Sequence, residues 1–463
     1  MNASFILLSL LILFGFILGF FGLTAHYLQI PTRARMLVVS VACILFSLGI
    51  AINNFKDPLQ EEGILTIPRL GFPLPREYRT PSQSLSLQRQ KKFTEIKKIS
   101  LPSAASAPPV LWKDLLIFGT EDSVVRALSR TSGEPVWTLT IKNPLSVLGL
   151  SAIDGKLFAG EKENSTGSSN FYCIEAQTGK VLWMVSLLGG AKTNPSADKS
   201  IGLLLIGTTT GASLALHYAS GEKHWKTELG PLVAETMFFN KKAFILSNRS
   251  DLPGKTALRA LVTNNSREYW HTFLEGEPMD LIAIDEKTDA LLILTMQHRP
   301  TEDADPQKAW IQMMIHNGKM RWRAEVPPDT LPSLLYSSRE KLVVFTTRSG
   351  FMIALNIYDG KELWRAEVGK ETRSGPSLFF PLSNPIIAAV SHDGVFSLRR
   401  AHDGKEIARS TLEPGATVPP VMSEDSAYVL TPGHLHIFGG LMSLKDKPST
   451  TPTKPISQPA EKK

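Results

Sequence analysis

Cysteine is almost absent from this chain of 463 residues, which contains only Cys43 and Cys173. Two cysteines exclude a scaffold stapled by several disulfides and any metal site built from four thiolates. Charged residues are also scarce, at 20% of the chain, and no c-type haem attachment motif occurs. The apolar fraction of 43% is ample for a hydrophobic core, so collagen-like and intrinsically disordered classes are excluded for the bulk of the sequence.

The formal net charge of +7 does not come from a basic folded body. Residues 1–52 carry +2, residues 53–103 carry +4 and residues 445–463 carry +3, whereas residues 104–444 carry −2. Nucleic-acid binding needs a basic patch or stripe on the folded surface. We therefore exclude nucleic acid as a partner and assign the positive charge to solubilising flanks.

Two uncharged hydrophobic segments stand at the N-terminus, Phe5–Ala25 and Met36–Ile52. Their lengths suit helices that cross the hydrocarbon core of a bilayer, and we predict transmembrane helices over 5–25 and 36–52. The alternative for the first segment is a cleaved signal peptide, which normally begins with a positive charge that Met1–Ser4 lacks. Arg33 and Arg35 lie in the short loop between the segments, so the positive-inside tendency predicts a cytoplasmic loop. Everything after residue 53 is then expected outside.

Gly15, Gly19 and Gly22 form a small-residue face on the first predicted helix. Such faces let helix backbones approach one another closely. The face can pack on the second helix of the same chain or on a separate membrane protein.

Proline marks both flanks of the central region. Residues 54–92 are predicted to be a Pro-rich tether, because proline removes a backbone donor and discourages helices and central strands. Residues 442–463 combine proline with Ser, Thr and Lys and are predicted to be a disordered tail. The folded domain is therefore expected over 93–441.

The tryptophans reveal an internal repeat within this domain. Six of the eight stand 42 to 52 residues apart, and a turn residue lies four positions before each. These pairs are Gly133 and Trp137, Gly179 and Trp183, Gly221 and Trp225, Ser266 and Trp270, Gly318 and Trp322, and Gly360 and Trp364. A seventh copy keeps its turn at Gly404 but has Ala408 in place of tryptophan. A period of about 40–50 residues is typical of β-propeller blades, and we interpret each tryptophan as packing between adjacent sheets.

The number of repeat units predicts how the ring closes. Seven full units occupy 104–141, 144–187, 189–229, 231–274, 276–326, 328–368 and 373–413. An eighth begins at Val418 and stops without a fourth strand, while Ile96–Leu101 is an isolated strand before the first unit. Because an unpaired sheet edge is a liability, we predict that the 96–101 strand completes the last blade. The fold class is all-β, an eight-bladed propeller, with seven blades as the alternative.

One stretch of the repeat resembles a known family. Residues 171–183 read Phe-Tyr-Cys-Ile-Glu-Ala-Gln-Thr-Gly-Lys-Val-Leu-Trp, and Phe351–Trp364 and Val125–Trp137 follow the same pattern more loosely. This pattern is similar to the Ala-Leu-Asp-Ala-x-Thr-Gly-Lys-x-x-Trp signature of PQQ-like β-propeller repeats. The resemblance implies a propeller fold. The family includes quinoprotein dehydrogenases and also non-catalytic members, such as the propeller subunit of the bacterial β-barrel assembly machinery.

A quinoprotein dehydrogenase would need, as the resemblance implies, a bound calcium ion, a catalytic Asp and often a ring of two adjacent cysteines. Cys173 is the only cysteine in 93–441, so that ring is impossible, and the units are nearly minimal in length. We predict no catalytic, cofactor-binding or metal-binding residue and expect a protein that is not an enzyme. His434 and His436 point to one face of a strand and are interpreted as surface residues.

Three units are longer between their second and third strands, and these loops are the candidate partner-binding sites. They are Glu161–Asn170, Asn248–Lys255 and Gln297–Lys308, the last containing Arg299, Glu302, Asp303 and Asp305. In a propeller such loops emerge on one face together with the links between blades. Long loops on one face of a rigid scaffold are typical of partner recognition.

These observations favour a non-enzymatic scaffold anchored in the bacterial inner membrane, with its propeller on the periplasmic side. The expected partners are subunits of a membrane-protein complex, and the resemblance suggests membrane-protein assembly or quality control. Fold alone does not decide function, so two alternatives stay open. One is a membrane-bound PQQ-dependent oxidoreductase, and the other is a sensor that binds a small ligand in its channel, although we do not expect such a ligand.

Overall fold

The structure is a computed structural model. It describes residues 93–230, 233–248, 254–284, 290–297, 308–315, 317–380, 385–423 and 425–444. Both predicted membrane helices, with Gly15, Gly19 and Gly22, and the predicted tether lie outside the described residues. No helix within the described ranges is both long and apolar enough to cross a bilayer.

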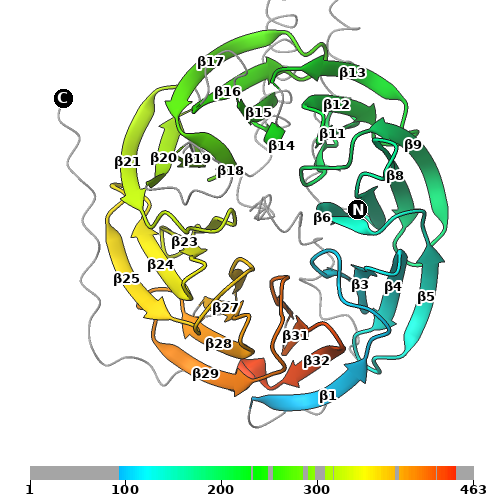
Figure 1. The fold of residues 1–463 in the computed structure, drawn as a ribbon, viewed down its shortest axis with the longest axis vertical. Helices are drawn as coiled ribbons and strands as arrows, with labels where there is room; N and C mark the ends of the chain where they lie inside the picture. The colour runs from blue at the N-terminus through cyan, green and yellow to red at the C-terminus, as the bar shows by residue number, and fades with distance from the viewer. Residues whose placement is uncertain are drawn as a thin grey trace, which may run out of the picture. The chain divides into compact units, whose positions relative to one another are not determined.

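The described residues form eight four-stranded antiparallel sheets, arranged as blades around a common axis (Figure 1). The prediction of eight blades is confirmed, and the seven-bladed alternative is wrong. We number the blades in chain order and the strands of each blade outward from the axis.

Blade 1 contains β2 (Val110–Trp112), β3 (Leu115–Thr120), β4 (Val124–Ser129) and β5 (Pro135–Thr140). Blade 2 contains β6 (Leu145–Ile153), β7 (Lys156–Glu161), β8 (Ser168–Glu175) and β9 (Val181–Leu188). Blade 3 contains β10 (Ser196–Asp198), β11 (Leu203–Gly207), β12 (Ala212–His217) and β13 (Lys223–Glu228). Blade 4 contains β14 (Val233–Phe239), β15 (Lys242–Asn248), β16 (Lys255–Val262) and β17 (Glu268–Glu275).

Blade 5 contains β18 (Glu277–Ala283), β19 (Ala290–Met296), β20 (Ala309–Ile315) and β21 (Met320–Val326). Blade 6 contains β22 (Leu335–Ser337), β23 (Leu342–Thr346), β24 (Phe351–Asn356) and β25 (Glu362–Glu367). Blade 7 contains β26 (Ser377–Phe379), β27 (Ile386–Val390), β28 (Val395–Arg400) and β29 (Glu406–Thr411). Blade 8 contains β30 (Val421–Ser423), β31 (Ser426–Leu430), β32 (His434–Gly439) and β1 (Thr94–Ser100), and a 3-10 helix, η2 (Leu441–Leu444), follows β32.

The hydrophobic core lies between the blades. The second strands β3, β11 and β19 are buried along their whole length, as expected for strands covered on both faces. The fourth strands alternate instead, as in β21, because one face packs on the next blade and the other meets solvent. Eight clusters of buried apolar side chains result, and each is built mainly from two neighbouring blades. Each blade is therefore stabilised by its neighbours.

Each repeat tryptophan contacts the turn of the following blade. A Cβ atom on Gly360 would lie 2.6 Å from Cε3 of Trp322, so the indole ring occupies the space that a side chain would need. Trp322 Nε1 also donates a hydrogen bond to Ile357 O at 2.8 Å. The same N–H to carbonyl contact is made at 3.1 Å by Trp137 and at 2.9 Å by Trp364. The predicted packing role of the tryptophans is confirmed.

The turn residue before each tryptophan has a left-handed backbone. The φ angle is positive at Gly133, Gly179, Gly221, Gly318, Gly360 and Gly404, and also at Ser266 in blade 4. Glycine adopts this conformation without strain and leaves room for the ring from the preceding blade.

Ala408 interrupts the tryptophan series at the boundary between blades 7 and 8. Blade 8 has no hairpin between its third and fourth strands, because the fourth strand is β1 from the other end of the domain. A tryptophan at position 408 would therefore have no turn to contact. Phe93 packs into the same cluster as Ala408 and stacks on Phe438, with ring centroids 5.3 Å apart.

β1 closes the ring by pairing antiparallel with β32 (Figure 1). The observed strand Thr94–Ser100 begins two residues before the predicted one, and the predicted closure is confirmed. Ile99 lies against Gly133 of blade 1, where a tryptophan lies in most other blades. Lys98 forms an ion pair with Glu413, and Lys97 donates to Ser132 O of the first blade.

We expect Gly360→Ala to destabilise the propeller more than Gly202→Ala. Both glycines have a positive φ, but nothing lies within 4 Å of a Cβ on Gly202. Backbone strain should lower the free energy of unfolding of the control, Gly202→Ala, by about 1–2 kcal/mol. Gly360→Ala should lower it by about 1–3 kcal/mol more, because the added methyl group overpacks against Trp322. Urea unfolding followed by tryptophan fluorescence measures the difference. Equal losses would show that the ring contact contributes nothing.

We expect the stability contributed by Glu413 to depend on pH. Hydrogen bonds from Lys98 and then from His434 lower the pKa of this carboxyl to about 2. A carboxyl with a lowered pKa stabilises the fold above its usual pKa of about 4.3, and this stabilisation is lost as the pH falls towards 2. Glu413→Gln should therefore lower the thermal midpoint at pH 7 and have no effect near pH 2, measured by circular dichroism. A difference that persists at pH 2 would show that the contribution is not ionic.

Candidate functional site

The links between blades and the turns between second and third strands lie on one side of the propeller. Lys162 N donates to Pro144 O at 2.8 Å and so joins the turn of blade 2 to the preceding link. His392 N donates to Glu371 O at 2.7 Å in the same way in blade 7. We call this side the loop face, and it is the side on which the longer loops were predicted.

The described chain begins and ends on the opposite side. Thr94 pairs with Gly439 at the end of β32, whereas Ser100 pairs with His434 beside the loop-face turn. Phe93 and η2 therefore both lie away from the loop face. The described chain thus enters and leaves the propeller on the side away from the loop face.

The first predicted loop, Glu161–Asn170, is an ordered turn on the loop face. Its connecting residues are 162–167, because β7 ends at Glu161 and β8 begins at Ser168. Asn164 Oδ1 accepts hydrogen bonds from Thr166 N at 2.9 Å and Ser168 N at 3.1 Å, which fixes the loop backbone. The loop is rigid enough to present a defined surface.

Glu161 itself was expected to contact a partner, and this expectation is wrong because its side chain is fully buried. Its carboxylate accepts hydrogen bonds from Lys142 N, Asn143 N and Nδ2, Asn170 N and Tyr172 Oη, at 2.8–3.1 Å. Burial and the bond to Glu161 raise the pKa of Tyr172 to about 12, so the phenol remains a donor. Glu161 holds the link before blade 2 and does not meet solvent. Asn170, at the other end of the loop, is part of this network.

The other predicted loops are described only at their ends. Asn248 ends β15, and Lys255 begins β16 with its Nζ 3.5 Å from Glu275. Residues 249–253 between them lie outside the described residues. Arg299, Glu302, Asp303 and Asp305 also lie outside the described residues.

A cavity of about 550 Å3 opens where the links of several blades converge on the loop face. Its wall is mostly apolar and includes Val147 and Leu148 of β6, Met279 of β18, and Leu331, Pro332 and Leu334 of the link before β22. We call this cavity, with its rim residues Lys162, Glu163, Lys192 and Arg373, the channel mouth.

Most charged groups of the channel mouth are already engaged. Lys162 Nζ lies 2.6 Å from Glu121, and Arg373 Nε lies 2.6 Å from Glu371. Glu163 Oε2 accepts a hydrogen bond from Thr209 at 2.6 Å. The site thus combines an apolar floor with a mostly neutralised rim, which is an arrangement suited to binding.

A second exposed feature lies on the outer surface of blade 2. The outward positions of β9 are Leu182, Met184, Ser186 and Leu188, and the three apolar side chains are 44%, 54% and 69% exposed. We call these four residues the apolar stripe. Four successive outward positions without a charge are unusual for an outer strand, which is normally protected by charged side chains.

The corresponding positions of blade 4 are Tyr269, His271, Phe273 and Glu275, which combine apolar and charged side chains. Those of blades 3, 5 and 6 mostly carry charge. They are His224, Lys226 and Glu228 in blade 3, Arg321, Arg323 and Glu325 in blade 5, and Leu363, Arg365 and Glu367 in blade 6. Blade 1 resembles blade 2, with the uncharged Val136, Thr138 and Thr140. The sequence interpretation missed the stripe, although β9 is apolar on both faces, whereas the outward faces of β13, β21 and β25 carry charges.

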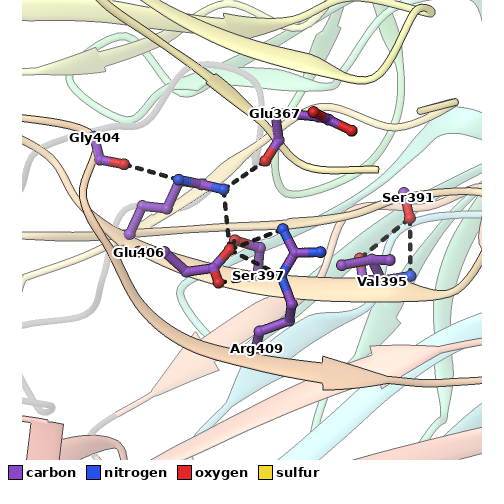
Figure 2. Close-up of polar contacts among 8 residues, drawn as sticks. Glu367, Ser391, Val395, Ser397, Gly404, Glu406 and Arg409 are labelled. Carbon is purple, nitrogen blue, oxygen red and sulfur yellow. Dashed lines mark hydrogen bonds and ion pairs between the residues drawn. The ribbon is translucent and has the colours of Figure 1, made fainter. Parts of the chain in front are cut away.

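A buried arginine crosses the boundary between blades 6 and 7. Arg399 replaces the leucine that blades 1, 3, 4 and 6 have at this register, and burial lowers the pKa of its guanidinium. It donates to Gly404 O and to Glu406 Oε2, both at 3.0 Å, and to Glu367 O of blade 6 (Figure 2). Glu406 also accepts from Arg409 at 3.0 Å (Figure 2). These hydrogen bonds connect the turn of blade 7 to the end of β25 in blade 6.

The histidine pair is structural. His436 is 2% exposed, and its Nδ1 lies 2.7 Å from Glu95 of β1, so its interpretation as a surface residue is wrong. His434 is partly exposed and lies 2.6 Å from Glu413. Burial raises the pKa of the Cys173 thiol to about 11, which leaves it unreactive. Within the described part of the chain, no three His, Cys, Asp or Glu side chains are placed to share a metal ion.

A family model described as "Outer membrane protein assembly factor BamB" matches residues 121–201 and 302–439. No curated protein matches the chain in sequence. Among solved structures, BamB from Moraxella catarrhalis is 15% identical with a TM-score of 0.54, and the match covers 75% of this chain and all of that one.

Two further structures share the fold but differ in kind. Quinohemoprotein alcohol dehydrogenase from Comamonas testosteroni is 13% identical with a TM-score of 0.55, covering 77% of this chain and 78% of that one. Saccharomyces cerevisiae Sqt1 is 13% identical with a TM-score of 0.58, covering 74% of this chain and 98% of that one. At such identities the likenesses show the fold alone.

We expect Glu406→Gln to destabilise the protein more than Glu362→Gln. Glu362 and Glu406 occupy the same position in blades 6 and 7, and each pairs with an arginine three residues later. Only Glu406 also forms an ion pair with the buried guanidinium of Arg399. Glu406→Gln should therefore lower the free energy of unfolding by about 1–2 kcal/mol, whereas Glu362→Gln should lower it by less than about 0.5 kcal/mol. Urea unfolding measures both. Equal effects would show that the Arg399 network adds nothing beyond the surface pair.

Proposed function

This chain is a PQQ-like β-propeller protein, and we propose that it is a non-enzymatic scaffold of a membrane-protein complex. The observation that carries the proposal is the apolar stripe on blade 2. An exposed apolar surface rimmed by polar residues typically marks a protein interface. Burying the exposed parts of Leu182, Met184 and Leu188 would contribute roughly 3–5 kcal/mol before the losses of association.

The stripe is held on a rigid body. The tryptophan contacts and the closing strand fix each blade between two others, so a partner meets a surface whose shape is set in advance. Such preorganisation lowers the entropy lost on binding. The loop face adds a second surface, because the described chain begins and ends on the opposite side.

We further propose that residues 5–25 and 36–52 anchor the protein in the bacterial inner membrane, with the propeller on the periplasmic side. Their hydrophobicity and the arginines of the intervening loop support this arrangement. The description of the matching family model as an outer membrane protein assembly factor supports membrane-protein assembly as the process.

The channel mouth does not fit the calcium-held quinone of the catalytic propellers. Calcium needs six to eight oxygen ligands or so, several of them carboxylates. Among the described residues that line this cavity, Glu163 is the one carboxylate, and Thr209 donates a hydrogen bond to one of its oxygens. We therefore derive no redox chemistry for this chain.

We expect Leu182→Glu to weaken partner binding. The full-length wild-type chain, purified in mild detergent, should co-purify with stoichiometric membrane proteins and show no quinone absorption. Leu182→Glu places a charge in the apolar stripe and should weaken the complex at least about tenfold. Quantitative mass spectrometry of the co-purified proteins measures the loss.

Leu363→Glu is the matched control. Leu363 also precedes its tryptophan by one residue and is 41% exposed, against 44% for Leu182, but its strand carries charges. This variant should keep its partners. A bound quinone with dye-reducing activity, or equal losses in both variants, would contradict the proposal.

A further inference from the structure

The inner strand of blade 2 is interrupted at the channel mouth. Leu145 of β6 pairs with Glu161, but the next pair joins Leu150 to Ala159, so residues 146–149 bulge out of the sheet. The inner strands β14 and β18 skip only one residue at the same place. The insertion carries Val147, which is 51% exposed and lines the cavity together with Leu148. Bulges that redirect side chains cluster at binding sites.

Lys192 and Ser374 at the channel mouth each have a polar group without a partner among the described residues. Lys192 Nζ forms no ion pair there, although Lys162 and Arg373 on the same rim are paired with carboxylates. Ser374 Oγ is buried and makes no hydrogen bond. A buried hydroxyl without a partner is unfavourable unless a ligand supplies one. Among the described residues, the cavity therefore offers the unpaired ammonium of Lys192, the buried hydroxyl of Ser374 and an apolar floor.

The position of these groups favours a long ligand over a compact one. Lys192 precedes blade 3 and Ser374 precedes blade 7, so they stand on opposite sides of an eight-bladed ring. An extended peptide advances about 3.3 Å per residue and spans such an opening with a few residues. Its side chains also alternate, so one can enter the cavity while its neighbours meet the rim.

We propose that the channel mouth binds an extended segment of a partner protein in which a large apolar residue stands next to an acidic one. The apolar side chain packs on Val147, Leu148 and Met279, and the neighbouring carboxylate pairs with Lys192. A backbone group of the segment bonds the Ser374 hydroxyl. This inference rests on the proposed scaffold function and names the chemistry of one of its partners.

The test is a selection from a phage-displayed library of random octapeptides. The target is the full-length chain in lipid nanodiscs, and empty nanodiscs remove unspecific binders. Selected peptides should share a large apolar residue beside Asp or Glu. A fluorescent copy of one selected peptide then measures affinity by anisotropy.

Lys192→Glu should weaken this peptide at least about tenfold and should shift the selection towards basic residues. Val147→Glu should weaken it similarly. Lys199→Glu is the control, because Lys199 pairs with Asp154 beside the turns away from the loop face, and it should bind like the wild type. Circular dichroism confirms that each variant is folded.

Three results would overturn the proposal. The first is a selection that yields no shared motif. The second is a selected peptide that binds Lys192→Glu as tightly as the wild type. The third is native mass spectrometry that shows a compact small molecule bound to the wild type and absent from Val147→Glu. If any of these occurs while the chain still co-purifies membrane proteins through the apolar stripe, the peptide site fails and the scaffold function stands. Loss of all partners from the wild type would instead remove the scaffold function.

Discussion

The propeller depends on one repeated contact, in which an indole ring lies on the turn of the next blade. At five of the six boundaries that have a tryptophan, the ring occupies the space of a side chain on the turn, so glycine is the residue there, and glycine also permits the positive φ of a tight hairpin. Blade 4 is the exception and has Ser266 at this position, also with a positive φ. The indole N–H of Trp322, for example, bonds a carbonyl oxygen beside that turn. The glycine at the turn therefore affects two things at once, the geometry of its own hairpin and the packing of that blade against the tryptophan of the preceding one. Because every core cluster spans two blades, no blade has a complete core until its neighbour is in place.

The exceptions to the repeat follow the same logic. Where the next blade has no hairpin, tryptophan is absent, and Phe93 packs beside Ala408. Where β1 supplies the outer strand, Ile99 lies on Gly133 in place of an indole. At the boundary between blades 6 and 7, the Arg399 network adds polar contacts to the tryptophan contact (Figure 2). At each of these boundaries, other side chains replace or supplement the contact that tryptophan makes elsewhere in the ring.

The sequence predicts the fold well because its signals are local and repeated. Trp, Gly and strand alternation recur within each unit, and counting them predicts eight blades and the closing strand. The candidate site is less predictable because burial depends on neighbours that are distant in the chain. Glu161 appears as an exposed loop residue until Lys142 and Tyr172 surround it, and His436 appears exposed until β1 covers it. The channel mouth draws its wall from several blades, so no single unit carries its pattern.

The pairing of β1 with β32 also has a consequence for synthesis. Thr94 and Gly439 are paired in the fold but lie at opposite ends of the domain's sequence. The first strand of the domain to be synthesised is therefore the last to find its partner. At about 5–20 residues per second, β1 waits roughly 20–70 s on the ribosome before β32 exists. During that interval it is an unpaired strand, open to wrong partners. Glu95, Lys97 and Lys98 place charges along it, and such charges discourage pairing with other strands until their own counterparts, His436 and Glu413 among them, have emerged.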